Sequence, residues 1–277
     1  MKINPLRLDT SDKDFEQKIL KRIRINNSIN KKVQNEVDAI ISNIKKNGDK
    51  SLVGFIRKFD NYNVKNIKNI IITPNEIKKA YECIDKLQLT NLKKSIKRIR
   101  DFSKKQKTVS WTSKKDGSIL GEKVTPIETV GIYVPAGKAS YPSTVLMNAI
   151  PAKIAGVKNI IMACPISNIE DHALAIVAAD LCGVHIILRM GGAHAIAALA
   201  YGTKSISKVD KIVGPGNIYV TLAKKAVFGD VGIDNIAGPS EVVIIADSSN
   251  NPDWIAMDLF SQAEHDELAQ PILISSS

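Results

Sequence analysis

The sequence predicts an α/β protein with Rossmann-like, doubly wound parallel sheet domains and a helical N-terminal region. From about residue 120 onward, short continuous apolar runs alternate with stretches of helical periodicity. Strands that are apolar at every position are typical of parallel sheets covered on both faces. Right-handed crossovers between such strands wind the chain to both sides of the sheet. The length of 277 residues allows one large domain or two smaller ones.

Residues 10–110 are predicted to be mostly helical. The segments "DFEQKILKRIRI" and "NKKVQNEVDAIISNIKKNGD" carry apolar residues at a period of 3.6, and the second ends at Gly48, a suitable C-cap. The segment "NIIITPNEIKKAYECIDKL" predicts a short strand followed by a helix that starts at Thr73 and Pro74.

The rest of the chain reads as alternating strands and helices. The first helix there starts near Pro142 and ends at Gly156. The predicted strands are "TVGIYVP", "NIIMACP", "VHIILRM", "KVDKIVG", "SEVVIIAD" and "PILIS". The predicted helices between them are "YPSTVLMNAIPAKIAG", "IEDHALAIVAADLCG", "AHAIAALAYG", "NIYVTLAKKAVFG" and "PDWIAMDLFSQAEHD".

Charge and composition narrow the function classes. The net charge is +11, and residues 1–120 hold 29 Lys and Arg against 13 Asp and Glu. The lysines lie on amphipathic stretches such as "TNLKKSIKRIRDFSKKQK", without the aromatic pattern of an RNA-binding module, so a solvated helix face is favoured over a nucleic-acid surface. No apolar run reaches the ~20 residues of a membrane span, and the start lacks a signal peptide. Three scattered cysteines fit a cytoplasmic protein.

Four glycine-bearing loops, "YVPAGKASYPS", "MGGAHA", "GPGN" and "AGPSE", follow predicted strands or open predicted helices. Free backbone N–H groups in such places hold phosphates, which predicts a nucleotide site at the carboxyl edge of the sheet. A P-loop is excluded, because Gly131 and Gly137 have the wrong spacing and Lys138 is followed by Ala139.

The segment "SQAEH" carries a possible metal site. Gln262 and His265 are three residues apart on a predicted helix and therefore share a face, whereas Glu264 points elsewhere. An amide oxygen and an imidazole nitrogen can both bind zinc, but zinc takes about four ligands. By spacing alone, an ordinary helix face remains the alternative.

The other histidines and the cysteines give weaker signals. His172 is expected at the surface, His185 is expected to be structural, and His194 opens a helix beside a glycine loop where it could contact a ligand. The three cysteines, Cys83, Cys164 and Cys182, have no neighbouring base in the sequence and are expected to be buried.

The segments "VGIYVPAGKASYPSTVLMNAIPAKIAGVKNII", "GGAHAIAALAYGT", "VDKIVGPGNIYVTLAKK", "AGPSEVVIIAD" and "SQAEHDELAQ" together resemble histidinol dehydrogenases, in order and in spacing. The resemblance extends over essentially the whole chain. It implies an NAD-dependent oxidation of L-histidinol to L-histidine through histidinaldehyde. It also implies two NAD⁺ reduced per product, one zinc per site, and a homodimer of Rossmann-like domains.

The resemblance assigns roles to particular residues. It places Tyr133, His194 and Asn217 at NAD-contacting positions and Ser240 at a substrate-contacting position. It also makes Gln262 and His265 zinc ligands that contact the substrate.

This sequence departs from the family pattern in three ways. His194 stands where a glutamine is usual, and Ala136 stands where a second glycine is usual. The chain also ends roughly 150 residues early for the family. The family's Glu-His acid/base pair, an aspartate zinc ligand and a histidine ligand from the partner subunit are therefore expected outside it.

The expected organisation follows from the resemblance. Residues 1–115 form the helical region and the start of a first Rossmann-like domain. Residues 116–237 form the NAD-binding Rossmann-like domain, and residues 238–277 return to the first. Two functions stay open: part of a histidinol dehydrogenase that needs a homodimer or a complementing C-terminal fragment, or a non-catalytic remnant or nucleotide-binding module.

Overall fold

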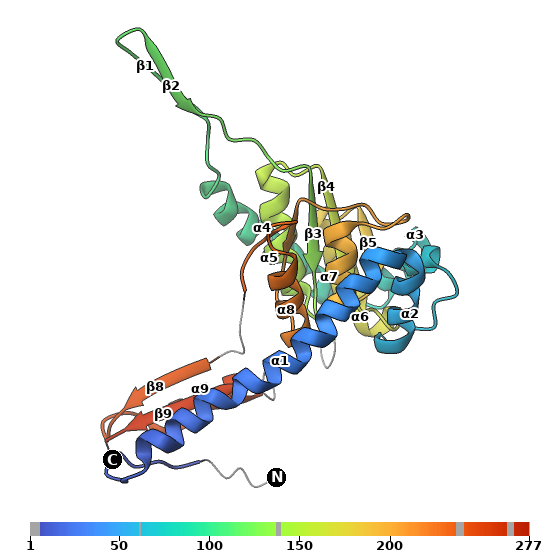
Figure 1. Ribbon diagram of the computed structural model, residues 1–277. Helices are drawn as coiled ribbons and strands as arrows, with labels where there is room; N and C mark the ends of the chain where they lie inside the picture. The colour runs from blue at the N-terminus through green and yellow to red at the C-terminus, as the bar shows by residue number, and fades with distance from the viewer. Residues whose placement is uncertain (1–5, 61, 137–139, 237–240, 265–268, 277) are drawn as a thin grey trace.

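The computed structural model describes residues 6–60, 62–136, 140–236, 241–264 and 269–276. Its centre is a five-stranded, wholly parallel sheet with the order β5-β4-β3-β6-β7, of which β3, β4 and β5 are labelled in Figure 1. The chain runs outward from β3 through β4 to β5, and then returns to the other side of β3 with β6 and β7. The predicted doubly wound sheet is confirmed. Its strands are β3 (Thr129–Tyr133), β4 (Asn159–Cys164), β5 (Ile186–Arg189), β6 (Lys211–Val213) and β7 (Gly232–Ile233).

Helices cover both faces of this sheet. Successive strand residues point to opposite sides, so neighbouring residues of one strand pack against different groups of helices. Ile132 and Ile160 pack into a core with one group of helices, and Tyr133 and Ile161 pack into a second core with the other group. The first group is α3 (Pro74–Glu82), α4 (Lys86–Lys105), α5 (Pro142–Ala155) and α6 (Ile169–Cys182). The second group is α1 (Phe15–Asn47), α2 (Asp49–Phe59), α7 (Gly192–Tyr201) and α8 (Ile218–Val227).

The helix boundaries in the N-terminal region follow local chemistry. Gly48, with φ +52°, separates α1 from α2, as predicted. Thr73 and Glu76 form a capping box at the start of α3, with Pro74 in its first turn. The strand predicted just before Thr73 is wrong. That segment forms the short 3-10 helix η1 (Ile67–Ile70) and then a single bridge from Ile71 to Leu188 on the edge strand β5.

An antiparallel hairpin was missed from the sequence. Strands β1 (Trp111–Lys115) and β2 (Ser118–Glu122) pair around a tight turn in which Asp116 and Gly117 both have positive φ. Every residue of both strands is exposed, and the hairpin projects from the body of the molecule (Figure 1). The dipeptide Asp116-Gly117 at this turn is a strong local hairpin signal.

The last elements form a separate small unit (Figure 1). Strand β8 (Glu241–Ala246) pairs in parallel with β9 (Gln270–Ser275), and α9 (Pro252–Ala263) packs against both. No residue of α9 is buried. Among the described helices, none combines the length and the apolar character that crossing a bilayer demands.

Candidate functional site

The strand order reverses between β3 and β6, so the carboxyl ends of these two strands form the topological switch point of the sheet. Ligands of doubly wound proteins bind in the crevice at such a point. Two of the predicted glycine loops lead away from it. One begins at Val134 after β3, and the other, residues 214–217, connects β6 to α8.

Glycines bring the two strand ends together. Gly214 has φ +115°, and a Cβ on it would lie 2.1 Å from the backbone oxygen of Tyr133. A Cβ on Gly216 would lie 2.3 Å from Cγ1 of Val220 in the first turn of α8. Any side chain at either position would push the loop away from β3 or from the helix. The "GPGN" segment therefore needs its glycines to close the crevice tightly.

Asn217 caps the helix that starts at this crevice. Its side-chain oxygen accepts hydrogen bonds from the backbone N–H groups of Tyr219 and Val220, at 3.1 Å and 3.2 Å. The residue is exposed, so its amide Nδ2 is the group left to donate to a ligand. The N-terminus of α8 carries the positive end of a helix dipole, which favours an anionic ligand.

Tyr133 lies beneath a neighbouring glycine loop. Only 4% of it is exposed, and its hydroxyl oxygen accepts a hydrogen bond from the Gly192 N–H at 3.1 Å. Burial raises the pKa of Tyr133, so the hydroxyl stays protonated. The structure thus ties the end of β3 to the start of α7.

His194 is held in a buried pair. It is 1% exposed, and its Nε2 lies 2.8 Å from Oδ2 of Asp60. The rings of Phe55 and Phe59 stack on its imidazole, with centroid distances of 6.1 Å and 6.0 Å. The same Asp60 oxygen accepts a hydrogen bond from the Gly191 N–H at 3.1 Å. Asp60 was missed from the sequence because it lies 134 residues before His194 and no local pattern marks the pair.

These contacts correct one expectation about the loop "MGGAHA". The N–H groups of Gly191 and Gly192 were expected to be free for a phosphate. Both are instead occupied, by Asp60 and by Tyr133. Neither of these two N–H groups is therefore free for a phosphate.

Of the three residues expected to bind metal or substrate, the structure describes one. Gln262 is half-buried in the last turn of α9. Ser240 and His265 lie outside the described residues. Within the described part of the chain, no group of three or more His, Cys, Asp or Glu side chains could hold a metal ion.

The remaining histidines have structural surroundings. The surface position expected for His172 is wrong, because only 6% of it is exposed and burial lowers its pKa. Nδ1 of His185 accepts a hydrogen bond from the Ile160 N–H at 3.0 Å, which joins β4 to the start of β5. This bond confirms the structural role predicted for His185.

Two of the three cysteines are buried as expected. Burial raises the pKa of Cys164 to about 12 and that of Cys182 to about 11, so neither thiol supplies a nucleophile at neutral pH. Cys83 is exposed, which corrects the expectation of burial at that position.

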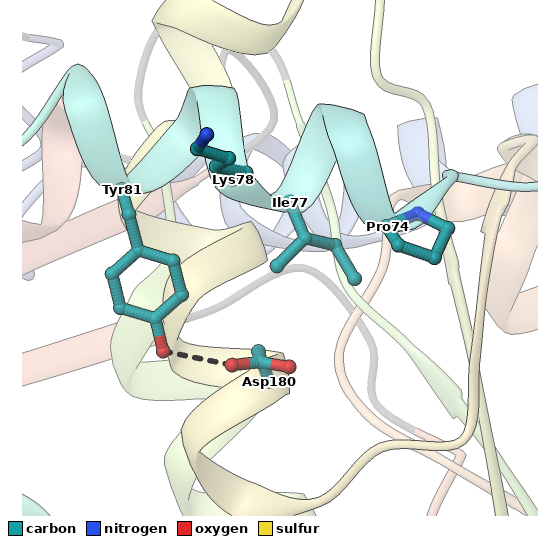
Figure 2. Close-up of a pocket in the computed structure, with 5 residues that line it drawn as sticks. All are labelled: Pro74, Ile77, Lys78, Tyr81 and Asp180. Carbon is teal, nitrogen blue, oxygen red and sulfur yellow. Dashed lines mark hydrogen bonds between the residues drawn. The ribbon is translucent and has the colours of Figure 1, made fainter.

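A shallow hollow between α3 and α6 belongs to the packing of these helices (Figure 2). There the hydroxyl of Tyr81 donates to Asp180 at 2.8 Å, and burial raises the pKa of Tyr81 to about 12. The other residues around it are Pro74, Ile77 and Lys78. None of them comes from the loops at the switch point.

Comparisons with known proteins identify the family. The family model for histidinol dehydrogenase matches residues 23–277. A histidinol dehydrogenase from Pseudomonas savastanoi pv. phaseolicola is 49% identical over 270 residues, which are 97% of this chain and 60% of the relative. One from Neisseria meningitidis is 46% identical over 272 residues, covering 98% of this chain and 63% of the relative.

A solved structure agrees with these sequence comparisons. The crystal structure of histidinol dehydrogenase from Elizabethkingia anophelis superposes with a TM-score of 0.78 at 37% identity, over 88% of this chain and 57% of that one. The chain spans about 60% of the length of the curated relatives it matches. By its sequence and by its fold, the chain belongs to the histidinol dehydrogenase family.

Proposed function

We propose that this chain supplies the cofactor-binding part of an NAD-dependent histidinol dehydrogenase. The reaction is the oxidation of L-histidinol to L-histidine through histidinaldehyde, with two NAD⁺ reduced. NAD⁺, when bound, accepts the hydride removed in each step. The observation that carries the proposal is the crevice at the switch point, where Gly214, Gly216 and Asn217 bring the N-terminus of α8 against the end of β3.

The residues at this crevice fit a dinucleotide. The dipole of α8 and the Nδ2 of Asn217 suit a pyrophosphate. In the loop after β3, Oγ of Ser140 is buried and has no hydrogen-bond partner among the described residues. A buried hydroxyl without a partner is costly, and a ribose or phosphate oxygen would satisfy it. Tyr133 and His194 would shape the floor of the site by holding the start of α7.

The metal and the substrate belong to the small unit in this proposal. Gln262 and His265 would be two zinc ligands, and Ser240 would contact L-histidinol beside them. Because zinc takes about four ligands, other polypeptide must complete the site. We propose that a homodimer or a complementing C-terminal fragment provides it, in the cytoplasm and without nucleic-acid or membrane partners.

Titration of the 277-residue chain with NAD⁺ in a calorimeter tests the cofactor site. We expect weak binding that Asn217→Ala reduces further, because this variant loses both the cap and the Nδ2 donor. Asn217→Ser keeps a good capping group and serves as the control for helix stability. Equal NAD⁺ affinity in Asn217→Ala and the unaltered chain would contradict the assigned site.

Turnover measurements separate the two functions left open, part of a histidinol dehydrogenase and a non-catalytic nucleotide-binding module. For the chain alone, we expect no measurable histidinol-dependent NADH formation when the reaction is followed by absorbance. The three described histidines are all buried or bonded, so none is free to move protons at an open site. Full turnover by the isolated chain would contradict this. Binding that never leads to turnover with any complementing fragment would favour a nucleotide-binding module.

A further inference from the structure

Lys224, in the middle of α8, is buried with its charge. Its side chain is 5% exposed, and its Nζ forms an ion pair with Oδ1 of Asp234. The same Nζ donates to the backbone oxygen of Gly214 at 3.0 Å. Oδ2 of Asp234 accepts from the Gly214 N–H at 2.7 Å. One ion pair thus holds both polar backbone groups of a single glycine.

Stability does not explain why a lysine occupies this position. Lysine is rarely buried unless it is paired, and a buried ion pair often contributes no more than apolar residues of similar volume. What the pair does is fix the position of the Gly214 backbone. Lys224 follows Asn217 by about two helical turns and reaches back to Gly214, where the loop leaves β6.

Fixing Gly214 fixes the rest of the loop. Gly214 presses against the backbone oxygen of Tyr133 at one side, and Gly216 packs on the first turn of α8 at the other. Between them the chain has little freedom, because Pro215 has a restricted φ. The orientation of Gly214 therefore decides where Asn217 begins the helix.

We propose that Lys224 and Asp234 are a positioning pair that sets the loop 214–217 and the N-terminus of α8 for the pyrophosphate of the dinucleotide. This inference rests on the proposed function for its ligand. Apart from the Asn235 N–H that donates to Oδ1 of Asp234, the described hydrogen bonds of the pair go to Gly214, and the pair acts on Asn217 through that residue.

The test compares Lys224→Met with Lys225→Met in the full 277-residue chain. Lys225 is the next residue of the same helix and is exposed, so its variant controls for the loss of one lysine. Native-state hydrogen exchange is measured on a peptide covering residues 212–218, without NAD⁺. We expect exchange there about ten-fold faster in Lys224→Met and unchanged in Lys225→Met, since a charged hydrogen bond is lost. The affinity for NAD⁺ should fall by a similar factor, and Lys224→Arg should restore part of both.

The two arms of the test separate the failure of the inference from that of the proposed function. If the unaltered chain binds no NAD⁺, the proposed cofactor site fails, while the exchange rates still decide whether the pair holds the loop. If Lys224→Met lowers only the melting temperature, and its loop exchange and NAD⁺ affinity match those of Lys225→Met, the pair is merely structural and the proposal is overturned. Should Lys224→Met not fold, the double variant Lys224→Met with Asp234→Asn replaces it, because it removes both charges of the pair and leaves neither unpaired.

Discussion

At the scale of single residues, the site depends on polar groups that meet from distant parts of the chain. Asp60, just after α2, joins the imidazole of His194 to the first peptide of the loop before α7. Its carboxylate is only 6% exposed, so water cannot replace it easily. This one side chain therefore links the N-terminal helical region to the Rossmann-like sheet.

Replacing Asp60 with alanine should destabilise the fold measurably. The variant leaves both the Gly191 N–H and the buried His194 ring without their partner, which costs about 1–3 kcal/mol for an unsatisfied buried group. Denaturant unfolding, followed by circular dichroism, measures the free energy of unfolding. Asp258→Ala is the control, because Asp258 is exposed on α9. Equal free energies of unfolding for the two variants would show that the pair of Asp60 and His194 does not stabilise the fold.

At the scale of elements, sequence periodicity was sufficient for the parallel sheet and its crossover helices. Continuous apolar strands and glycine-ended helices such as α5 and α6 follow from local rules. The division of the chain at residues 115 and 237 stays a prediction. The two-residue strand β7 and the bridge at Ile71 could not be predicted, because both depend on tertiary pairing rather than on any pattern of their own.

The site was predictable only in part, for a similar reason. Asn217 and the glycines at 214 and 216 are marked by the local segment "GPGN". The pair of Lys224 with Asp234 holds Gly214, and Asp60 holds Gly191 and His194 at the neighbouring loop. These are ordinary charged residues whose role exists only once the sheet brings them together. Charge alone on an amphipathic helix gives no such signal.

The projecting hairpin should be dispensable for stability. Both of its strands are exposed along their whole length. Replacing residues 111–122 by a short Gly-Ser linker removes no buried residue, so we expect the free energy of unfolding to change by less than about 0.5 kcal/mol. Denaturant unfolding of the shortened chain measures it. A larger loss would mean that the hairpin packs on the body in solution.

At the scale of the whole molecule, the small unit of β8, α9 and β9 has one covered face and one open face. Helix α9 packs on one side of the two strands. Val243 pairs with Ile272, and Ile245 pairs with Ile274, so these four residues project from the same face. Their exposed fractions are 54%, 42%, 79% and 53%, in that order. Soluble monomers seldom leave a contiguous apolar face of this kind to water, and such faces mark contacts with other polypeptide.

We therefore expect the chain to self-associate through this face as its concentration rises. Ile245→Lys should reduce the association, because a lysine on an apolar sheet face carries a charge that must be desolvated on contact. Ile119→Lys is the matched control. Ile119 is also an isoleucine with 66% exposure, but it lies on the projecting hairpin, far along the chain from β8. Light scattering over a concentration series measures the mean molar mass of the unaltered chain and of each of the two variants. If Ile245→Lys and Ile119→Lys scatter like the unaltered chain at every concentration, the open face of β8 and β9 is not a contact surface, and the proposed completion of the site by other polypeptide must involve another part of the molecule.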